Sequence, residues 1–259
     1  MPRFELGLAT PLRFESKLRD WAPPAIELGK SETVAIEFEG HEFIWHDPDT
    51  DHDPTIVVTH KDDREALASV RYATQRLLSA LAFETESSIG TGGSTSNGEA
   101  DAWWQPSVNP PRSAYFTWLR TAPSRVDVSN DPRVRLALAV NREALSAGSP
   151  LYRFLAFWNA IEVAIPDDGE RRQFLDARVP YEQGWSERTD VRGVTPSTYL
   201  WNQSRKPVAH GAMGPRRVID PDDAVERSRL ELDGTVLEPL VKMAILRLDA
   251  NPVRATYRS

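Results

Sequence analysis

Two helix starts with proline at the first helical position constrain this fold more than any other feature. Asp131-Pro132 and Ser149-Pro150 each place a capping side chain directly before proline, the usual order at a helix N-terminus. Gly148 lies between them and can end the first helix. Two amphipathic helices packed as an antiparallel hairpin are therefore expected. Their apolar faces comprise Val134, Leu138 and Leu145, then Leu151, Phe154, Leu155, Trp158, Ile161 and Ala164.

The rest of the C-terminal half also has helical patterns. Residues 168–175 predict a short helix, Thr195-Pro196 begins another, and the acidic residues 220–223 precede a long final helix. Gly234 and Pro239 are expected to break or kink that final helix. We therefore predict that residues 126–259 form an all-α domain of four or five helices.

The N-terminal half has β-strand patterns instead. Residues 34–38 and 41–45 carry β-forming residues on either side of Glu39-Gly40, which predicts a hairpin, and residues 55–59 predict a further strand. One long helix is expected over residues 63–84, where leucines and Val70 recur at helical spacing. Residues 1–125 are thus predicted to be a mixed, β-rich module, and the fold class of the whole chain is α+β.

Composition narrows the functional classes. The formal net charge of −7 means that a nucleic-acid role would need a local basic patch. The absence of cysteine excludes disulfides and thiolate metal sites. Neither a signal peptide nor an apolar run long enough to span a membrane is visible, so we expect a cytoplasmic protein.

Three segments resemble functional motifs only superficially. The acidic residues 46–53 lack the glycine and glutamate of a calcium loop in either register, which favours a solvated turn. The glycine-rich residues 87–98 lack the lysine of a phosphate-binding loop and follow a helix, which favours a mobile or bulged connection. The aromatic residues between 103 and 118 fit core packing or an interdomain seam, with a base-stacking surface as the alternative.

The candidate chemistry lies at Arg205 and His210, five residues apart. Histidine can exchange protons near neutral pH, and the guanidinium fork suits phosphate oxygens. Pro207 disfavours helix at Lys206, so Arg205 is expected at a helix end and His210 in or beyond a bend. Glu162, an acid late in an apolar helix, is either a stray surface residue or the partner of an arginine.

This pattern resembles the R-x4-6-H signature of the HEPN superfamily of small helical bundles. Residues 199–211, and 157–162 on an earlier helix, look like the Apea-type and MauJ-like branches of that group. The resemblance covers roughly residues 130–250. One departure concerns Lys206, which follows the arginine where many active members carry Asn, Asp or His, and which cannot accept a hydrogen bond from the catalytic histidine.

The resemblance implies a metal-independent endoribonuclease, without cofactor, that cleaves single-stranded RNA by attack of the 2′-OH. Such enzymes are usually homodimers whose two motifs face each other, and some are toxins or antiviral effectors. Arg205 and His210 would be catalytic, with Lys206, Glu162 and Asn202 in support. Two further arginines, Arg216 and Arg217, would bind RNA as a local basic patch.

Three other interpretations remain open. The chain can be a non-catalytic HEPN-like dimer that binds a partner protein or a small ligand, which Lys206 and the negative net charge favour. It can be an accessory protein of an amine-utilisation locus, as the MauJ-like resemblance implies. His210 can also simply cap a helix while Arg205 pairs with Glu162 to hold the bundle together.

Overall fold

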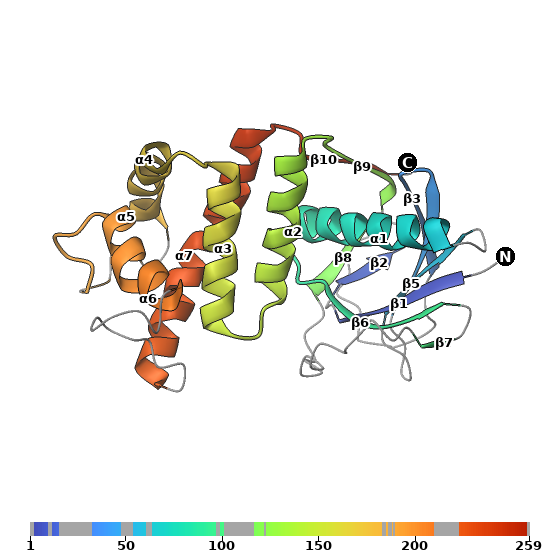
Figure 1. Cartoon of the computed structure of the whole chain (residues 1–259), viewed down its shortest axis with the longest axis horizontal. Helices are drawn as coiled ribbons and strands as arrows, with labels where there is room; N and C mark the ends of the chain where they lie inside the picture. Colours follow the sequence, from blue (N-terminus) through green and yellow to red (C-terminus); the bar gives the residue numbers. More distant parts are fainter. Residues whose placement is uncertain are drawn as a thin grey trace. The chain divides into compact units, whose positions relative to one another are not determined.

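The computed structural model confirms the predicted α+β class. It describes residues 3–9, 12–15, 33–47, 54–60, 64–96, 99–100, 117–121, 123–182, 185, 188, 190–209 and 223–257. The chain divides into two compact units (Figure 1). The first unit is Met1–Val128 together with Val253–Ser259, and the second, helical unit is Ser129–Pro252. The end of the chain therefore belongs to the first unit.

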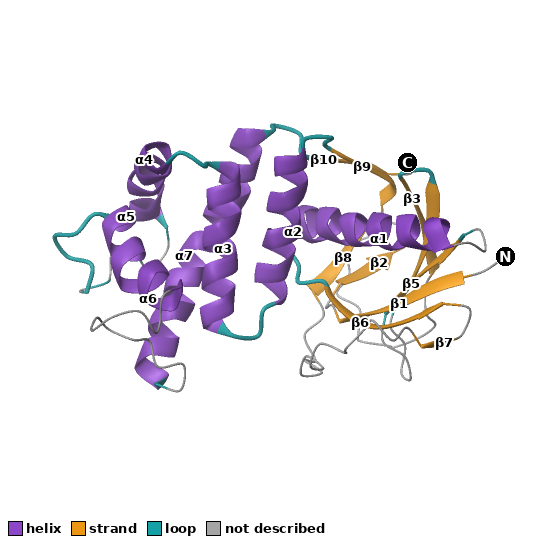
Figure 2. Ribbon diagram, in the orientation of Figure 1, coloured by secondary structure: helices purple, strands orange, loops and turns teal. Residues whose placement is uncertain are grey.

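The first unit is built on an eight-stranded sheet of order β10-β9-β3-β4-β5-β1-β6-β7, shown in orange in Figure 2. A separate parallel pair joins β2 to β8. The strands are β1 (Arg3–Ala9), β2 (Leu12–Glu15), β3 (Thr33–Phe38), β4 (His41–His46), β5 (Thr55–Thr59), β6 (Gly90–Ser96), β7 (Glu99–Ala100), β8 (Thr117–Thr121), β9 (Pro123–Val128) and β10 (Val253–Tyr257).

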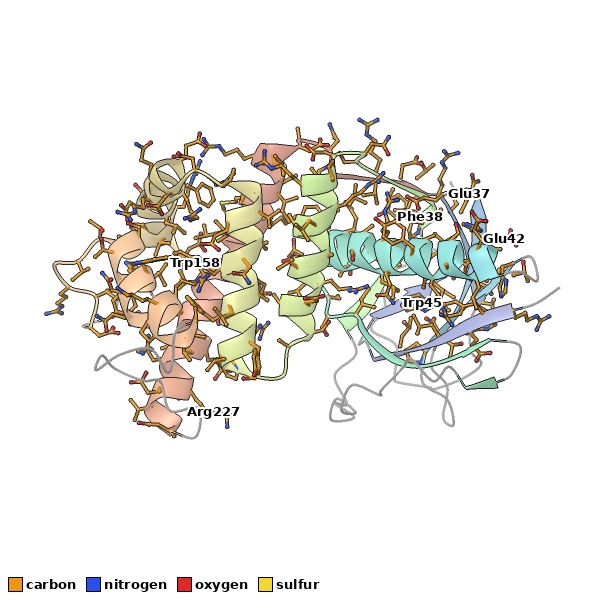
Figure 3. All side chains as sticks on the ribbon, viewed as in Figure 1. Glu37, Phe38, Glu42, Trp45, Trp158 and Arg227 are labelled. Carbon is orange, nitrogen blue, oxygen red and sulfur yellow. The ribbon has the colours of Figure 1, made fainter. Side chains whose placement is uncertain are left out.

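The predicted hairpin is confirmed as β3 and β4. Its two turn residues, Glu39 and Gly40, both have positive φ, as the tight turn that matches strand twist requires. Alternation sets the buried face, because Phe38 and Trp45 are buried whereas Glu37 and Glu42 are exposed (Figure 3). The predicted long helix is confirmed as α1 (Arg64–Thr85), which packs on this sheet.

Helices make up the second unit, in purple in Figure 2. They are α2 (Pro132–Ser146), α3 (Pro150–Ala164), α4 (Asp168–Arg178), the 3₁₀ turn η1 (Val179–Tyr181), α5 (Pro196–Tyr199), the π-helical segment η2 (Leu200–Arg205), α6 (Lys206–Ala209) and α7 (Ala224–Leu248). Both proline-started helices are confirmed, and the Asp131 side chain accepts a hydrogen bond from the Arg133 backbone N–H. The α3 helix packs against both α2 and α7.

The final helix is unbroken, so the expected break at Gly234 or Pro239 is wrong, while the kink expected as its alternative stays a prediction. The α7 helix runs from Ala224 to Leu248 with Gly234 and Pro239 inside it. Burial explains why the sequence signal fails: Leu237, Leu240, Val241, Ala244 and Ile245 are all 0% exposed around Pro239. This packing offsets the one hydrogen bond that proline removes.

The other segment predictions have mixed outcomes. The glycine-rich stretch contains strand β6, which pairs with β1 through a register shift between Leu6 and Leu8. Two segments lie largely outside the described residues: the acidic turn at residues 46–53, of which 48–53 are not described, and the aromatic segment at 103–118, of which 103–116 are not described. No helix among the described residues is long and apolar enough to cross a membrane.

Candidate functional site

The predicted site residues fall into two groups. Four lie in the described chain: Glu162 on α3, Asn202 and Arg205 on η2, and Lys206 at the start of α6. The other three, His210, Arg216 and Arg217, lie outside the described residues. The structure therefore places the arginine half of the Arg205–His210 motif.

A π-helical turn carries Arg205, which corrects the expectation that it sits at a helix end. The helix continues from Leu200 through η2 into α6 and includes Pro207. The Lys206 backbone N–H donates to the Trp201 carbonyl, five residues back, instead of the usual four. A proline inside an α-helix clashes with the carbonyl four residues earlier, which is that of Gln203, and widening the turn before Pro207 relieves this clash.

Glu162 is the partner of two arginines rather than a stray surface acid. Its Oε2 lies 3.8 Å from Arg205 Nη2, and its Oε1 lies 3.8 Å from Arg171 Nη2. At these distances the groups form ion pairs, but they are too far apart for hydrogen bonds. Arg171 is buried and donates to the carbonyls of Ile165 (3.0 Å) and Pro166 (3.3 Å) beyond the end of α3. Glu162 is thus held beside Arg205 by a structural arginine.

Trp201 lies beside Arg205 and contacts a second tryptophan. The guanidinium carbon of Arg205 lies 6.0 Å from the centroid of the Trp201 ring, within cation–π range. Trp201 in turn contacts Trp158 of α3, with ring centroids 5.9 Å apart (Trp158 is labelled in Figure 3). Arg205 Nε and Trp158 Nε1 are both buried and have no hydrogen-bond acceptor in the described part of the chain.

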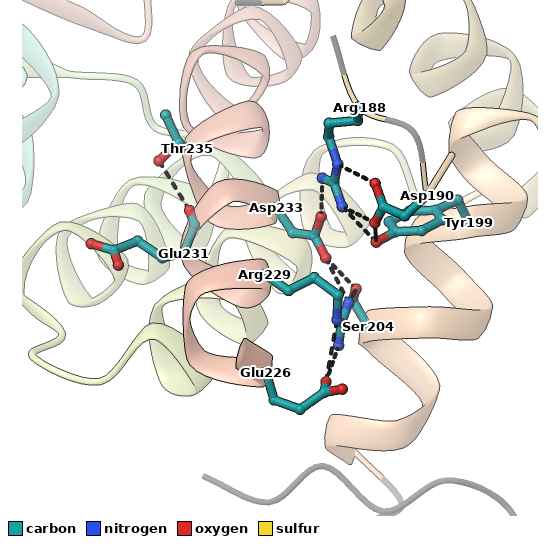
Figure 4. Close-up of polar contacts among 9 residues, drawn as sticks. All are labelled: Arg188, Asp190, Tyr199, Ser204, Glu226, Arg229, Glu231, Asp233 and Thr235. Atoms are coloured by element: carbon teal, nitrogen blue, oxygen red, sulfur yellow. Dashed lines mark hydrogen bonds and ion pairs between the residues drawn. The ribbon is translucent and has the colours of Figure 1, made fainter. Parts of the chain in front are cut away.

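The residue before Arg205 anchors η2 to α7. Ser204 is fully buried and donates its hydroxyl hydrogen to Oδ2 of Asp233, which is also fully buried (Figure 4). Arg229 Nη1 donates to Asp233 Oδ2 (3.0 Å) and to Ser204 Oγ (2.7 Å), while its Nη2 donates to Glu226 (2.9 Å). This network fixes the π-helical turn against α7.

The same carboxylate ties in the segment before α5. Arg188 Nη1 donates to Asp233 Oδ1, and Nε and Nη2 of Arg188 donate to the two oxygens of Asp190 at 3.1 and 2.7 Å. Tyr199 donates its hydroxyl hydrogen to Asp190 (2.7 Å) (Figure 4). These contacts connect three segments around one buried acid.

Charge and burial shift the pKa values in this network. Hydrogen bonding to Arg188 lowers the pKa of Asp190 to about 2. Burial, helped by the charge of Asp233, raises the pKa of Tyr199 to about 12. Burial also raises the pKa of the Asp233 carboxyl, although its hydrogen bonds from Ser204 and Arg188 oppose the shift.

Sequence reasoning missed this network and the role of Trp158. Arg229 and Asp233 stand four residues apart on one helix, a spacing that could have suggested an ion pair. Nothing in the sequence links Arg188 or Ser204 to them, because 45 and 29 residues separate these partners from Asp233. The sequence pattern predicts only that Trp158 lies on an apolar helix face.

Metal ligation finds no support in the described chain. No group of three or more His, Asp or Glu side chains that could hold a metal ion occurs among the described residues. Around Asp233 the charged side chains pair with one another, because Arg188 and Arg229 each join Asp233 to a second carboxylate, Asp190 or Glu226.

Comparison with known proteins gives a family match within the helical unit. The family described as methylamine utilization protein MauJ matches residues 137–246. The match begins inside α2 and ends inside α7, so it lies within the helical unit. Neither a curated protein nor a solved structure matches the chain significantly. The helical unit is therefore similar to MauJ proteins.

Proposed function

We propose that the helical unit is a HEPN-like endoribonuclease module in which Arg205 binds the scissile phosphate of single-stranded RNA. The observation that supports this is the state of Arg205 itself. Its guanidinium is held by Trp201 and by Glu162 at 3.8 Å, yet its Nε has no acceptor among the described residues. A positioned guanidinium with an unused donor is suited to an anionic oxygen.

The chemistry assigned to the pair is transfer within the RNA chain. His210 takes the proton from a ribose 2′-OH, whose oxygen attacks the adjacent phosphorus. The bond from phosphorus to the 5′-oxygen breaks, and that oxygen receives a proton from a general acid. Arg205 stabilises the charge on the non-bridging oxygens. The products are a 2′,3′-cyclic phosphate and a 5′-OH.

A homodimer would supply both an acid and a base. Two copies of the Arg205–His210 pair at a two-fold axis would place one histidine on each side of the phosphate. Asn202 is exposed and Lys206 is partly exposed, so both can reach RNA from the same helix. Arg216 and Arg217 would extend the contact to neighbouring phosphates. Such an enzyme would suit a toxin or an antiviral effector of the cytoplasm.

The direct test is RNA cleavage by the purified full chain with EDTA present. We expect cleavage with 2′,3′-cyclic phosphate ends, and its loss in His210→Ala and Arg205→Ala. Arg247→Ala is the matched control, because that arginine is exposed on α7 and pairs only with an exposed glutamate in the described chain. Equal cleavage by wild type and His210→Ala would refute the assignment.

The MauJ match favours a second candidate function. The helical unit would then act as a non-catalytic accessory module in methylamine utilization, binding a partner protein or a small ligand as a dimer. The Arg205–Glu162 ion pair would then help to hold the helical bundle together. Growth of a deletion strain of the source organism on methylamine separates the two: if His210→Ala restores growth fully and the protein cleaves no RNA, the accessory function replaces the ribonuclease.

A further inference from the structure

Two orphaned donors belong to the helical segments α3 and η2, which contact each other. Arg205 Nε and Trp158 Nε1 are buried nitrogens without an acceptor in the described residues, and Trp158 as a whole is only 3% exposed. An unmet buried donor is costly, so each one calls for an explanation. Both groups can only donate, so whatever satisfies them must bring an acceptor oxygen.

Trp201 links the two side chains that carry these donors, because both contact its ring. Trp158 and Glu162 are four residues apart on α3 and so lie on one face of that helix. Trp201 and Arg205 are four residues apart on η2. The two helical segments meet through two contacts, Trp158 with Trp201 at 5.9 Å and Glu162 with Arg205 at 3.8 Å.

Charge decides which kind of acceptor fits. Arg205 and Arg171 both face Glu162, so two positive charges share one carboxylate at 3.8 Å. Asp168 pairs with Arg171 and Arg172, so among the described residues three guanidinium groups face two carboxylates in this cluster. The cluster therefore carries an excess positive charge, which favours an anionic oxygen over a neutral one.

We infer that Trp158 Nε1 and Arg205 Nε form an oxyanion site that takes a phosphate group. Phosphate binding at this site does not depend on the proposed ribonuclease function. Only the identification of the phosphate as part of RNA rests on that function. Trp158 becomes a binding residue that supplies a neutral donor beside the charged one. An isolated indole donor discriminates by position, because it offers a single fixed N–H.

Trp201 controls entry to this site. Both donor nitrogens are buried in this conformation, and the Trp201 ring contacts both Trp158 and Arg205. Trp201 itself is partly exposed. Its ring therefore has to swing aside when the phosphate enters, which exchanges two ring contacts for two charge-oriented hydrogen bonds.

The test uses the indole N–H signals of the full-length protein labelled with ¹⁵N-tryptophan. Trp158→Phe identifies the Trp158 signal and Trp201→Phe identifies its neighbour. Inorganic phosphate and a 2′-O-methyl RNA, which cannot be cleaved, are the two probes. We expect both to shift the Trp158 and Trp201 signals. Trp45 is the internal control, because its Nε1 already donates to Asp47 (2.9 Å) in the first unit.

A second part of the test compares two arginine-to-lysine substitutions, one at the site and one on the exposed surface. Arg205→Lys keeps a positive charge but loses Nε of the guanidinium fork, and it should weaken phosphate binding about tenfold or more. Arg247→Lys, on the exposed surface of α7, should leave the affinity unchanged. General charge attraction would leave the affinity unchanged in both variants, because lysine keeps the charge. That outcome, or equal weakening by both substitutions, would overturn the site.

The remaining outcomes also discriminate. A Trp158 signal that neither probe shifts, or one that shows contact with water alone, overturns the inference and assigns the donors to a buried water. Shifts without any RNA cleavage leave the phosphate site standing and refute the ribonuclease. His210-dependent cleavage with an unmoved Trp158 signal refutes the site and leaves the ribonuclease intact.

Discussion

Removing the Asp233 carboxylate should destabilise the helical unit strongly. Asp233→Ala removes the acceptor of three donors: Arg188 Nη1, the Ser204 hydroxyl, and one N–H of Arg229 Nη1, which keeps its other hydrogen bond to Ser204 Oγ. A stranded donor costs about 1–3 kcal/mol, so the minimum is about 3 kcal/mol. The total stays near that minimum for two reasons. Each arginine keeps a second carboxylate partner. The substitution also removes the cost of burying a carboxylate at position 233, where burial raises the pKa of Asp233.

Two matched substitutions calibrate this value. An amide at position 233 can turn its oxygen to the side that serves Ser204 and Arg229, which leaves one donor of Arg188 facing an NH₂ group. Asp233→Asn should therefore cost about 1–2 kcal/mol. Asp190→Ala removes another partner of the same Arg188, but the Asp190 side chain is 47% exposed and water replaces it. That change should cost about 1 kcal/mol or less.

Urea unfolding of the full chain measures these differences. Because the chain has two units, hydrogen exchange of the α7 amides is needed to assign the change to the helical unit. The expected order of destabilisation is Asp233→Ala, then Asp233→Asn, then Asp190→Ala. If Asp233→Ala costs no more than Asp190→Ala, the argument from stranded donors fails.

Three further predictions follow from the same contacts. Burial raises the pKa of Tyr199 to about 12, so the folded state keeps a proton that the unfolded state loses near pH 10. The stability difference between the wild type and Tyr199→Phe should therefore be constant below about pH 10 and shift against the wild type between about pH 10 and 12 in parallel urea titrations; a difference that stays constant over the whole range would contradict this. Pro207→Ala restores a backbone donor and should let the π-helical turn become α-helical, which should raise the melting temperature. Arg205 would then rotate away from Glu162, so phosphate binding should weaken; unchanged binding would mean that the π-helical turn does not affect the site. Glu162→Gln removes a competing charge 3.8 Å from Arg205 and should raise phosphate affinity about fivefold by calorimetry, whereas a loss of affinity would make Glu162 a part of the binding surface.

Local rules predicted most of the fold. The hairpin around Glu39-Gly40 followed from alternation and turn residues, and Asp131-Pro132 followed from capping preferences. Pro239 misled the prediction because its penalty is local, whereas the packing of α7 against α3 is a tertiary effect. The strand β10 was missed for the same reason, since its pairing with β9 joins residues more than a hundred positions apart.

The site was predictable only where its chemistry is local in sequence. Arg205 was found from its spacing to His210, and Glu162 from its position as an acid in an apolar helix. The side chains that position them act across the fold. Ser204 contacts Asp233 across 29 residues, and Trp158 meets Trp201 on another helix. Short-range patterns carry no information about such pairs.

The π-helical turn joins these long-range contacts to the candidate chemistry. Ser204 points to Asp233, while Arg205, the next residue, points to Glu162 and Trp201. Successive side chains on a helix diverge by a set rotation, which is about 100° in an α-helix and smaller in the wider π-helical turn, so one anchored residue sets the direction of the next. The buried network therefore fixes the direction of Arg205 without touching it. Ser204→Ala should leave the fold intact at the loss of one buried hydroxyl bond, about 1 kcal/mol, yet loosen Arg205 and weaken phosphate binding. If phosphate affinity is unchanged in that variant, the direction of Arg205 is set by Trp201 and Glu162 alone.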